Sequence, residues 1–225
     1  IREPIFFLML LTALVLIGNF PSMALFVFSE QLKLVVDSSM ATSLLFGLLA
    51  AVLCASHTVS REMRNGTVLL LLSKPVHRGS FILAKITGIV LAASVFTAVC
   101  NLGSIASVYI AVDQFRMDMG AYFSFWGVVI VSCIAGMVAN FWKGSSFSST
   151  TTVAISLLMP LFVVYCHMTR EHPALSLRDL GAALVLINLA VVAMSTLAVV
   201  FATRLDVVAN LTVCSIFFFL GLISG

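Results

Sequence analysis

The sequence predicts an all-α, polytopic membrane protein with about six to seven transmembrane helices and a short cytoplasmic helix between spans two and three. Hydrophobic residues make up 61% of the chain, charged residues only 9%, and the mean hydropathy is +1.18. Soluble domains carry about 25% charged residues, so a water-soluble fold is excluded. A helix needs about 20 apolar residues to cross a bilayer, and several such runs are present. The runs are continuously apolar rather than alternating, which also excludes a β-barrel.

Seven apolar runs are expected to form the helices, at residues 5–28, 38–57, 81–112, 121–142, 150–167, 180–203 and 207–225. Asn19 and Pro21 lie in the first run, so a kink or break is expected near its end. Residues 30–37 are expected to be a short polar connection. In the third run, Thr97, Asn101 and Ser104 have the spacing of a single helix face.

The later connections are short and polar. Residues 113–120 are expected to be a turn, 143–149 a tight return and 170–179 a mixed-charge loop. The last apolar run stops abruptly at Gly225, a pattern compatible with truncation at the C-terminus. Residues 1–225 are therefore expected to form a single transmembrane domain.

Basic residues gather between the second and third spans. Five of the twelve Lys and Arg residues lie there: Arg61, Arg64, Lys74, Arg78 and Lys85. With the N-terminus in the cytoplasm, the cytoplasmic side receives these five together with Arg2, Lys143 and Arg204, and the other side receives Lys33, Arg116, Arg170 and Arg178. Because cytoplasmic loops are enriched in Lys and Arg, this count of eight against four predicts a cytoplasmic N-terminus and a cytoplasmic loop at residues 60–80.

That loop contains an apolar segment of its own. Thr67 can cap a short helix over residues 68–73, Pro75 would end it, and Ser80 can cap the third span. The result would be an apolar rod with charged ends near the membrane surface. The rod either buries itself among lipid headgroups or serves as a docking element for a soluble partner. The residues by themselves favour neither interpretation.

The same loop contains Arg61-Glu62, Gly66-Thr67, the run Leu70-Leu71-Leu72-Ser73-Lys74-Pro75-Val76, Arg78 and Lys85. This arrangement resembles the cytoplasmic loop of permeases of type-2 ABC exporters. Ala84-Lys85 stands where the family usually has Gly-Lys, and His77 where it often has Ser. Arg2-Glu3, Thr203-Arg204, Asn210, Cys214 and residues 217–221 are similar to one branch of that family.

The resemblance implies a transmembrane permease subunit that works with a second permease subunit and a separate ABC ATP-binding subunit. The loop would include a coupling helix that contacts the ATP-binding subunit. The family's loop would place these residues at the ATPase: Glu62, Arg64, Thr67, Leu69, Leu70, Leu72, Lys74, Pro75 and Arg78. Leu69 to Leu72 would pack on the partner, and the charged residues would form the rim. The resemblance also implies a multi-pass protein of a prokaryotic plasma (inner) membrane.

No cofactor is expected in this chain, since ATP and Mg would be bound by the partner. The sequence has no Gly-x4-Gly-Lys-Ser/Thr loop, no His-Glu-x-x-His helix and no Gly-x-Ser-x-Gly elbow. The chain itself is therefore not expected to be an enzyme. The net charge of +3 gives no indication of a nucleic-acid partner. The alternative is a secondary carrier or channel that needs no ATPase, and an integral-membrane enzyme is a more distant one.

Four asparagines, Asn19, Asn101, Asn140 and Asn188, are polar groups inside the expected spans. Such side chains more often bond between helices than bind a substrate. The four histidines lie at span ends or in loops, where an imidazole is simply interfacial. The five cysteines are scattered singly and behave as small apolar residues, so neither a metal site nor a disulfide is expected.

Overall fold

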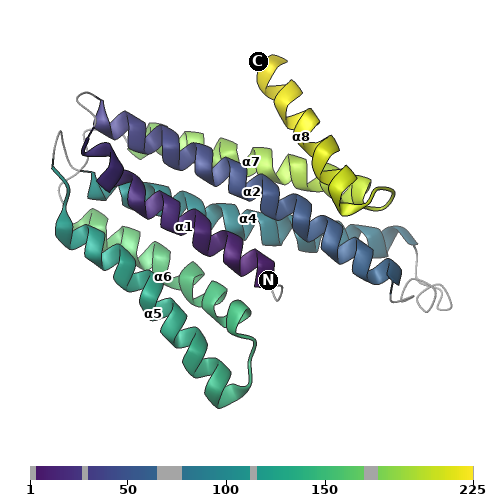
Figure 1. Cartoon of the computed structure of the whole chain (residues 1–225), viewed down its shortest axis with the longest axis horizontal. Helices are drawn as coiled ribbons and strands as arrows, with labels where there is room; N and C mark the ends of the chain where they lie inside the picture. The colour runs from purple at the N-terminus through teal and green to yellow at the C-terminus, as the bar shows by residue number, and fades with distance from the viewer. Residues whose placement is uncertain (1–3, 27–29, 65–77, 112–115, 170–176, 225) are drawn as a thin grey trace. The chain divides into compact units, whose positions relative to one another are not determined.

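The chain is mainly helical in the part that the structure describes, residues 4–26, 30–64, 78–111, 116–169 and 177–224 of a computed structural model (Figure 1). The helices are α1 (Pro4–Ala24), α2 (Gln31–Arg64), α4 (Arg78–Ile110), α5 (Met119–Lys143), α6 (Phe147–Thr169), α7 (Leu177–Ala202) and α8 (Val207–Ser224). Six of them, α1 to α7, contain stretches long and apolar enough to cross a membrane, while α8 is a shorter apolar helix. The predicted all-α, multi-span fold class is confirmed.

The helix α2 begins earlier than the sequence predicts. Residues 30–37 were expected to be a polar connection, but α2 already starts at Gln31. Lys33 pairs with Glu30 at 3.2 Å on the surface, whereas Val35 and Val36 are buried among apolar neighbours. The prediction was wrong because two charged and two apolar residues at helical spacing can form one amphipathic turn.

Two further boundaries differ from the predictions. Ser80 was expected to cap the third span, but α4 begins at Arg78 and Ser80 lies inside it. The expected loop at 170–179 is shorter, because α7 begins at Leu177. A kink or break was also expected near Pro21, and no break occurs there, since α1 continues to Ala24. Proline near a helix end removes a single backbone donor, and Ser22 Oγ donates to the Asn19 carbonyl at 2.7 Å in the same turn.

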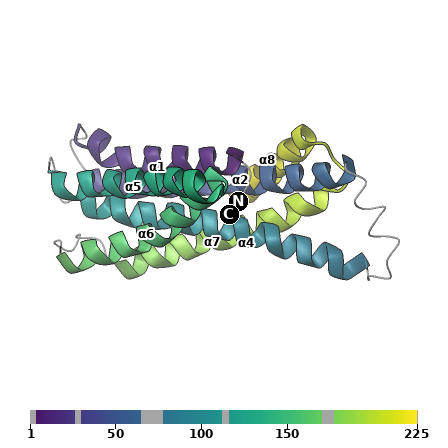
Figure 2. The ribbon, with the colours of Figure 1, turned by 90° about the horizontal axis from the view of Figure 1, so that it is seen from below.

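Helices α5 and α6 form a tight hairpin and lie side by side (Figures 1 and 2). Asp118 caps α5 by accepting a hydrogen bond from the Ala121 amide at 3.0 Å. Gly144 ends α5 with φ of 63°, a left-handed conformation that glycine adopts without strain, and its amide donates to the Asn140 carbonyl at 3.0 Å. The tight return predicted at 143–149 thus contains a helix C-cap and the first turn of α6.

The chain divides into two compact units. Unit 1 comprises Ile1–Phe46 and Val95–Ile187, and unit 2 comprises Gly47–Ser94 and Asn188–Gly225. Unit 1 holds α1, α5 and α6, and unit 2 holds α8. Helices α2, α4 and α7 contribute residues to both units.

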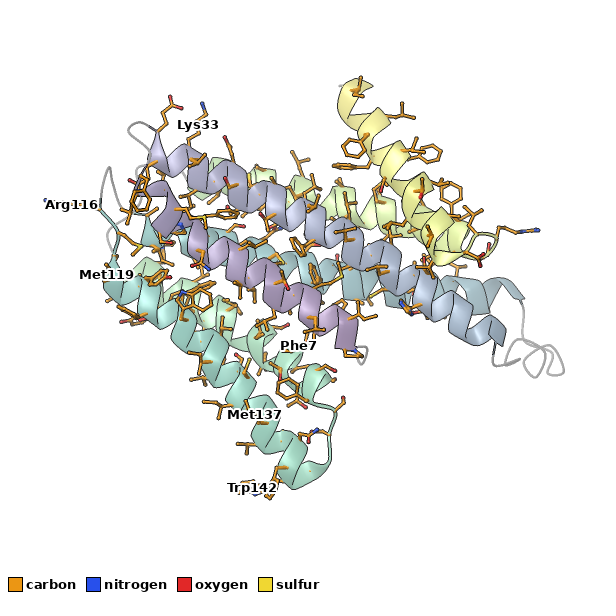
Figure 3. The ribbon with its side chains drawn as sticks, in the orientation of Figure 1. Phe7, Lys33, Arg116, Met119, Met137 and Trp142 are labelled. Carbon is orange, nitrogen blue, oxygen red and sulfur yellow. The ribbon has the colours of Figure 1, made fainter. Side chains whose placement is uncertain are left out.

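In unit 1, α1 supplies a buried apolar face that includes Phe6, Leu10, Leu14 and Ile17. Phe6 makes an edge-to-face contact with Phe96 at 5.3 Å between ring centroids. Helix α5 has an apolar surface that is exposed. Met137 and Trp142 project outward from it (Figure 3), and Trp142 is 80% exposed. An exposed apolar surface of this kind is what a helix presents to lipid.

Candidate functional site

The charged loop lies between the longest two helices of the described chain. The candidate span in α2 comprises Gln31–Thr58, and the helix continues to Arg64. The candidate span in α4 comprises Ile86–Ile110, and that helix already begins at Arg78. Since a helix rises about 1.5 Å per residue, these additions are about 9 Å and 12 Å long. Both flanks of the loop are therefore helical where the sequence becomes charged.

The structure places three of the nine predicted docking residues on these helices. Glu62 and Arg64 belong to the last turn of α2, and Arg78 is the first residue of α4. The other six lie outside the described residues: Thr67, Leu69, Leu70, Leu72, Lys74 and Pro75. The short coupling helix predicted over 68–73 lies there as well.

The flanking helices are anchored to α7 and α8 in unit 2. A buried apolar cluster joins residues of all four helices: Val52 and Ala55 of α2, Ile89 of α4, Ala198, Val199 and Ala202 of α7, and Cys214 of α8. Four of its members are alanine or cysteine, and small side chains allow membrane helices to approach closely. The two helices next to the loop thus share one packed core.

Asn188 connects α7 to α4 within unit 2. Ser94 Oγ donates to Asn188 Oδ1 at 2.9 Å, and Asn188 Nδ2 donates to the Ser94 carbonyl at 3.3 Å. The Asn188 side chain therefore pairs with both the hydroxyl and the backbone carbonyl of Ser94. This reciprocal pair is an interhelical bond of the kind that the sequence predicts for these asparagines.

Asn101 connects α4 to α7 within unit 1. Its Nδ2 donates to the Leu184 carbonyl at 2.9 Å, while its Oδ1 is buried and has no hydrogen-bond partner among the described residues. Ser104, one turn further, lies 3.1 Å from Ser43 Oγ of α2. Thr97, Asn101 and Ser104 are all buried, which confirms that they share an inward face of α4.

The other two predicted asparagines make mostly local bonds. Asn19 Nδ2 donates to the Val15 carbonyl at 2.8 Å within α1, and Tyr122 Oη of α5 donates to Asn19 Oδ1 at 3.4 Å. Asn140 is exposed and its Nδ2 donates to the Ser145 carbonyl at 2.8 Å, across the α5–α6 turn. Asn140 therefore stabilises the turn.

Asn210 was not among the predicted intramembrane asparagines. It is fully buried in unit 2, where its Nδ2 donates to Ser56 Oγ at 2.8 Å and to the Ala198 carbonyl at 3.1 Å. Cys214 Sγ donates to Asn210 Oδ1 at 3.4 Å. A signal was available in the sequence, because Asn210 and Cys214 are four residues apart and so occupy one helix face.

The titratable residues that the structure describes do not form a cluster suited to a metal. Within the described ranges, no group of three or more His, Cys, Asp or Glu side chains could hold an ion. His57 is exposed, and His167 Nδ1 lies 2.8 Å from Tyr109 Oη. The structure thus presents interhelical polar contacts and a charged loop with helical flanks.

These features define a multi-pass integral membrane protein whose spans are joined by a charged loop on helical supports. The chain belongs to a known family of such proteins: residues 4–171 match the family described as ABC-2 family transporter protein. The resemblance to type-2 ABC permeases is confirmed by this match, and the family consists of transport subunits that work with ABC ATP-binding partners. Comparisons with curated proteins and with solved structures found no match.

Proposed function

We propose that this chain is the transmembrane subunit of an ATP-driven exporter. A separate ATP-binding subunit would bind ATP and Mg and grip the loop between α2 and α4, and a second permease subunit would complete the transport pathway. The observation that supports this most directly is that both flanks of the loop are helices packed into one core with α7 and α8.

A loop transmits force only if its supports are stiff. A helix with its backbone hydrogen bonds intact resists bending, whereas a flexible tether would absorb the displacement. Glu62, Arg64 and Arg78 lie at the loop ends of α2 and α4. A push on the loop would therefore move both helices inside the membrane.

The distribution of charge supports a cytoplasmic position for the loop. Lys33 and Arg116 lie at one end of unit 1, and Trp142 at the opposite end (Figure 3). Lys143 follows Trp142 directly. Because two spans, α4 and α5, separate Lys143 from the loop, a cytoplasmic loop would place Lys143 on the cytoplasmic side as well. The N-terminus would then also lie in the cytoplasm, in agreement with the excess of Lys and Arg on that side. The prokaryotic plasma membrane and the outward direction of transport follow from the resemblance of the loop to exporter permeases.

The test is co-purification of the chain with the ABC ATP-binding subunit encoded beside it. We expect Glu62→Lys and Leu70→Asp each to reduce the recovered ATPase at least fivefold, because they disrupt the charged rim and the apolar contact. Arg116→Glu, a charge reversal at an exposed site in the connection between α4 and α5, is the matched control and should leave recovery unchanged. Amounts of each variant in the membrane fraction are measured in parallel.

Unchanged recovery of the ATPase with Glu62→Lys and Leu70→Asp, together with unchanged transport, would refute the proposal. A secondary carrier or channel would then be the better interpretation. Loss of recovery with the Arg116→Glu control as well would mean that charge reversal acts on the whole protein rather than at the loop.

A further inference from the structure

The geometry points to Asn210 as the positioning residue that couples the loop-side end of α2 to the α7–α8 hairpin, so that displacement of the loop moves these three helices together. This inference rests on the proposed ATP-driven function. It concerns a part of the chain beyond residues 4–171, the range that the family match covers.

The Asn210 side chain makes hydrogen bonds to residues of α2, α7 and α8. Its Nδ2 donates to Ser56 Oγ of α2 at 2.8 Å and to the Ala198 carbonyl of α7 at 3.1 Å, and its Oδ1 accepts from Cys214 Sγ of α8 at 3.4 Å. Both amide hydrogens and the amide oxygen of this side chain are thereby engaged. A single amide joins three helices.

The position of Ser56 determines which part of α2 is held by its hydrogen bond with Asn210. Ser56 lies eight residues before Arg64, the last residue of α2, which corresponds to about 12 Å along a helix. It is fully buried, so the bond forms inside the packed part of unit 2 rather than at its surface. Movement of the α2 end must therefore either carry Asn210 with it or break the bond.

Breaking the bond is unfavourable because its surroundings are apolar. The cluster around it contains Val52, Ala55, Ala198, Ala202 and Cys214. A buried amide separated from its partners in such a setting has no water to replace them. The α7–α8 hairpin is held further by Phe201 and Phe217, whose rings stack at 5.7 Å between centroids and 20° between planes.

The second flank of the loop has a corresponding attachment. Ser94 of α4 and Asn188 of α7 form the reciprocal pair described above. Each flanking helix is thus joined to α7 by one asparagine within unit 2. The two attachments differ in one respect: only Asn210 brings in α8, through its own backbone and Cys214.

The experiment compares association with coupling in the full complex with the ABC ATP-binding subunit. Three variants are made: Asn210→Ala, the milder Ser56→Ala, and the exchange Ser56→Asn with Asn210→Ser, which restores a bond between α2 and α8. The control is Thr212→Ala, because Thr212 is exposed on the same helix and, among the described residues, bonds only to the Val208 carbonyl, at 2.9 Å. The readouts are recovery of the ATPase, and the ratio of its hydrolysis rate in the complex to its rate alone.

We expect Asn210→Ala to retain at least half of the ATPase recovery. The ratio of the hydrolysis rate in the complex to the rate of the ATPase alone should fall at least fivefold, toward one. Ser56→Ala should shift the ratio in the same direction by about twofold, the exchange variant should recover at least half of the loss, and Thr212→Ala should match the unaltered protein. A lowered rate ratio with the ATPase still recovered is a result that a merely destabilised fold would not give, and recovery by the exchange assigns the effect to the bond between positions 56 and 210.

An unchanged rate ratio in both Asn210→Ala and Ser56→Ala, with the ATPase still bound, would overturn the role of Asn210 and leave the proposed function standing. Loss of ATPase recovery in parallel with the rate ratio, without recovery by the exchange, would likewise overturn it by showing a purely structural role. Failure of the unaltered chain to bind the ATPase would instead overturn the proposed function, and the inference with it.

Discussion

Gly136 of α5 lies directly against Thr151 of α6. A Cβ added at position 136 would collide with Thr151 Oγ1, and it would lie 3.1 Å from Thr151 Cβ and 3.2 Å from Phe147 Cε2. Thr151 is fully buried, and its hydroxyl donates to the Phe147 carbonyl at 2.9 Å. The close packing of the α5–α6 hairpin therefore depends on the missing side chain at position 136.

We predict that Gly136→Ala destabilises the protein by about 1–3 kcal/mol, the usual cost of overpacking a well-packed core. The measurement is the unfolding midpoint of the purified chain in detergent. Gly127→Ala on the same helix is the control, since a Cβ there meets nothing within 4 Å and alanine is the better helix former. Thr151→Ala should offset part of the loss, because it removes the colliding hydroxyl. A neutral Gly136→Ala would show that α5 and α6 pack less closely than described.

The second prediction compares two substitutions of Asn101, a buried residue of α4. Asn101→Ala should lower stability by about 1 kcal/mol, since it removes the bond to the Leu184 carbonyl and leaves a small void. Asn101→Leu should cost less than Asn101→Ala, because leucine fills the space and also removes a buried oxygen that has no partner in the described part of the chain. Unfolding of both variants in detergent checks this order. The reverse order would mean that the asparagine amide contributes more than its one observed bond.

Ser94 and Asn188 should show energetic coupling. Ser94→Ala and Asn188→Ala remove the same reciprocal pair, so their effects on unfolding should be non-additive by about 0.5–1.5 kcal/mol. The matched control combines Asn188→Ala with Thr196→Ala, because the hydroxyl of Thr196 donates within its own helix, to the Ala193 carbonyl. That control pair should be additive. Additive effects in the Ser94 and Asn188 pair would contradict a direct bond.

The span order predicts which connections face the same side. Two spans, α4 and α5, separate residue 70 from Ser146, so both positions should lie on one side of the membrane, whereas Arg116 lies one span away from each. We expect Leu70→Cys and Ser146→Cys, in a chain without its native cysteines, to react with an impermeant maleimide only from the cytoplasmic side. Arg116→Cys should react only from the other side. Labelling of residue 70 from the outside would contradict the proposed contact with an ATPase.

The sequence was sufficient for the fold class because a transmembrane span is a local property. Whether about 20 consecutive residues are apolar enough to cross a bilayer is decided by those residues themselves. The same locality made Thr97, Asn101 and Ser104 readable as one helix face. It failed at residues 30–37, where the charges of Glu30 and Lys33 concealed the burial of Val35 and Val36.

The contacts of individual side chains could not be obtained in this way. Asn210 and Ser56 are 154 positions apart, and nothing in either segment identifies the other as its partner. Gly136 likewise reads as an ordinary small residue until α6 is placed against it. The sequence by itself determined which segments enter the membrane and that a basic loop joins two of them. Only the tertiary structure decided which polar groups meet, because a buried hydrogen bond depends on the approach of helices that the chain order leaves far apart.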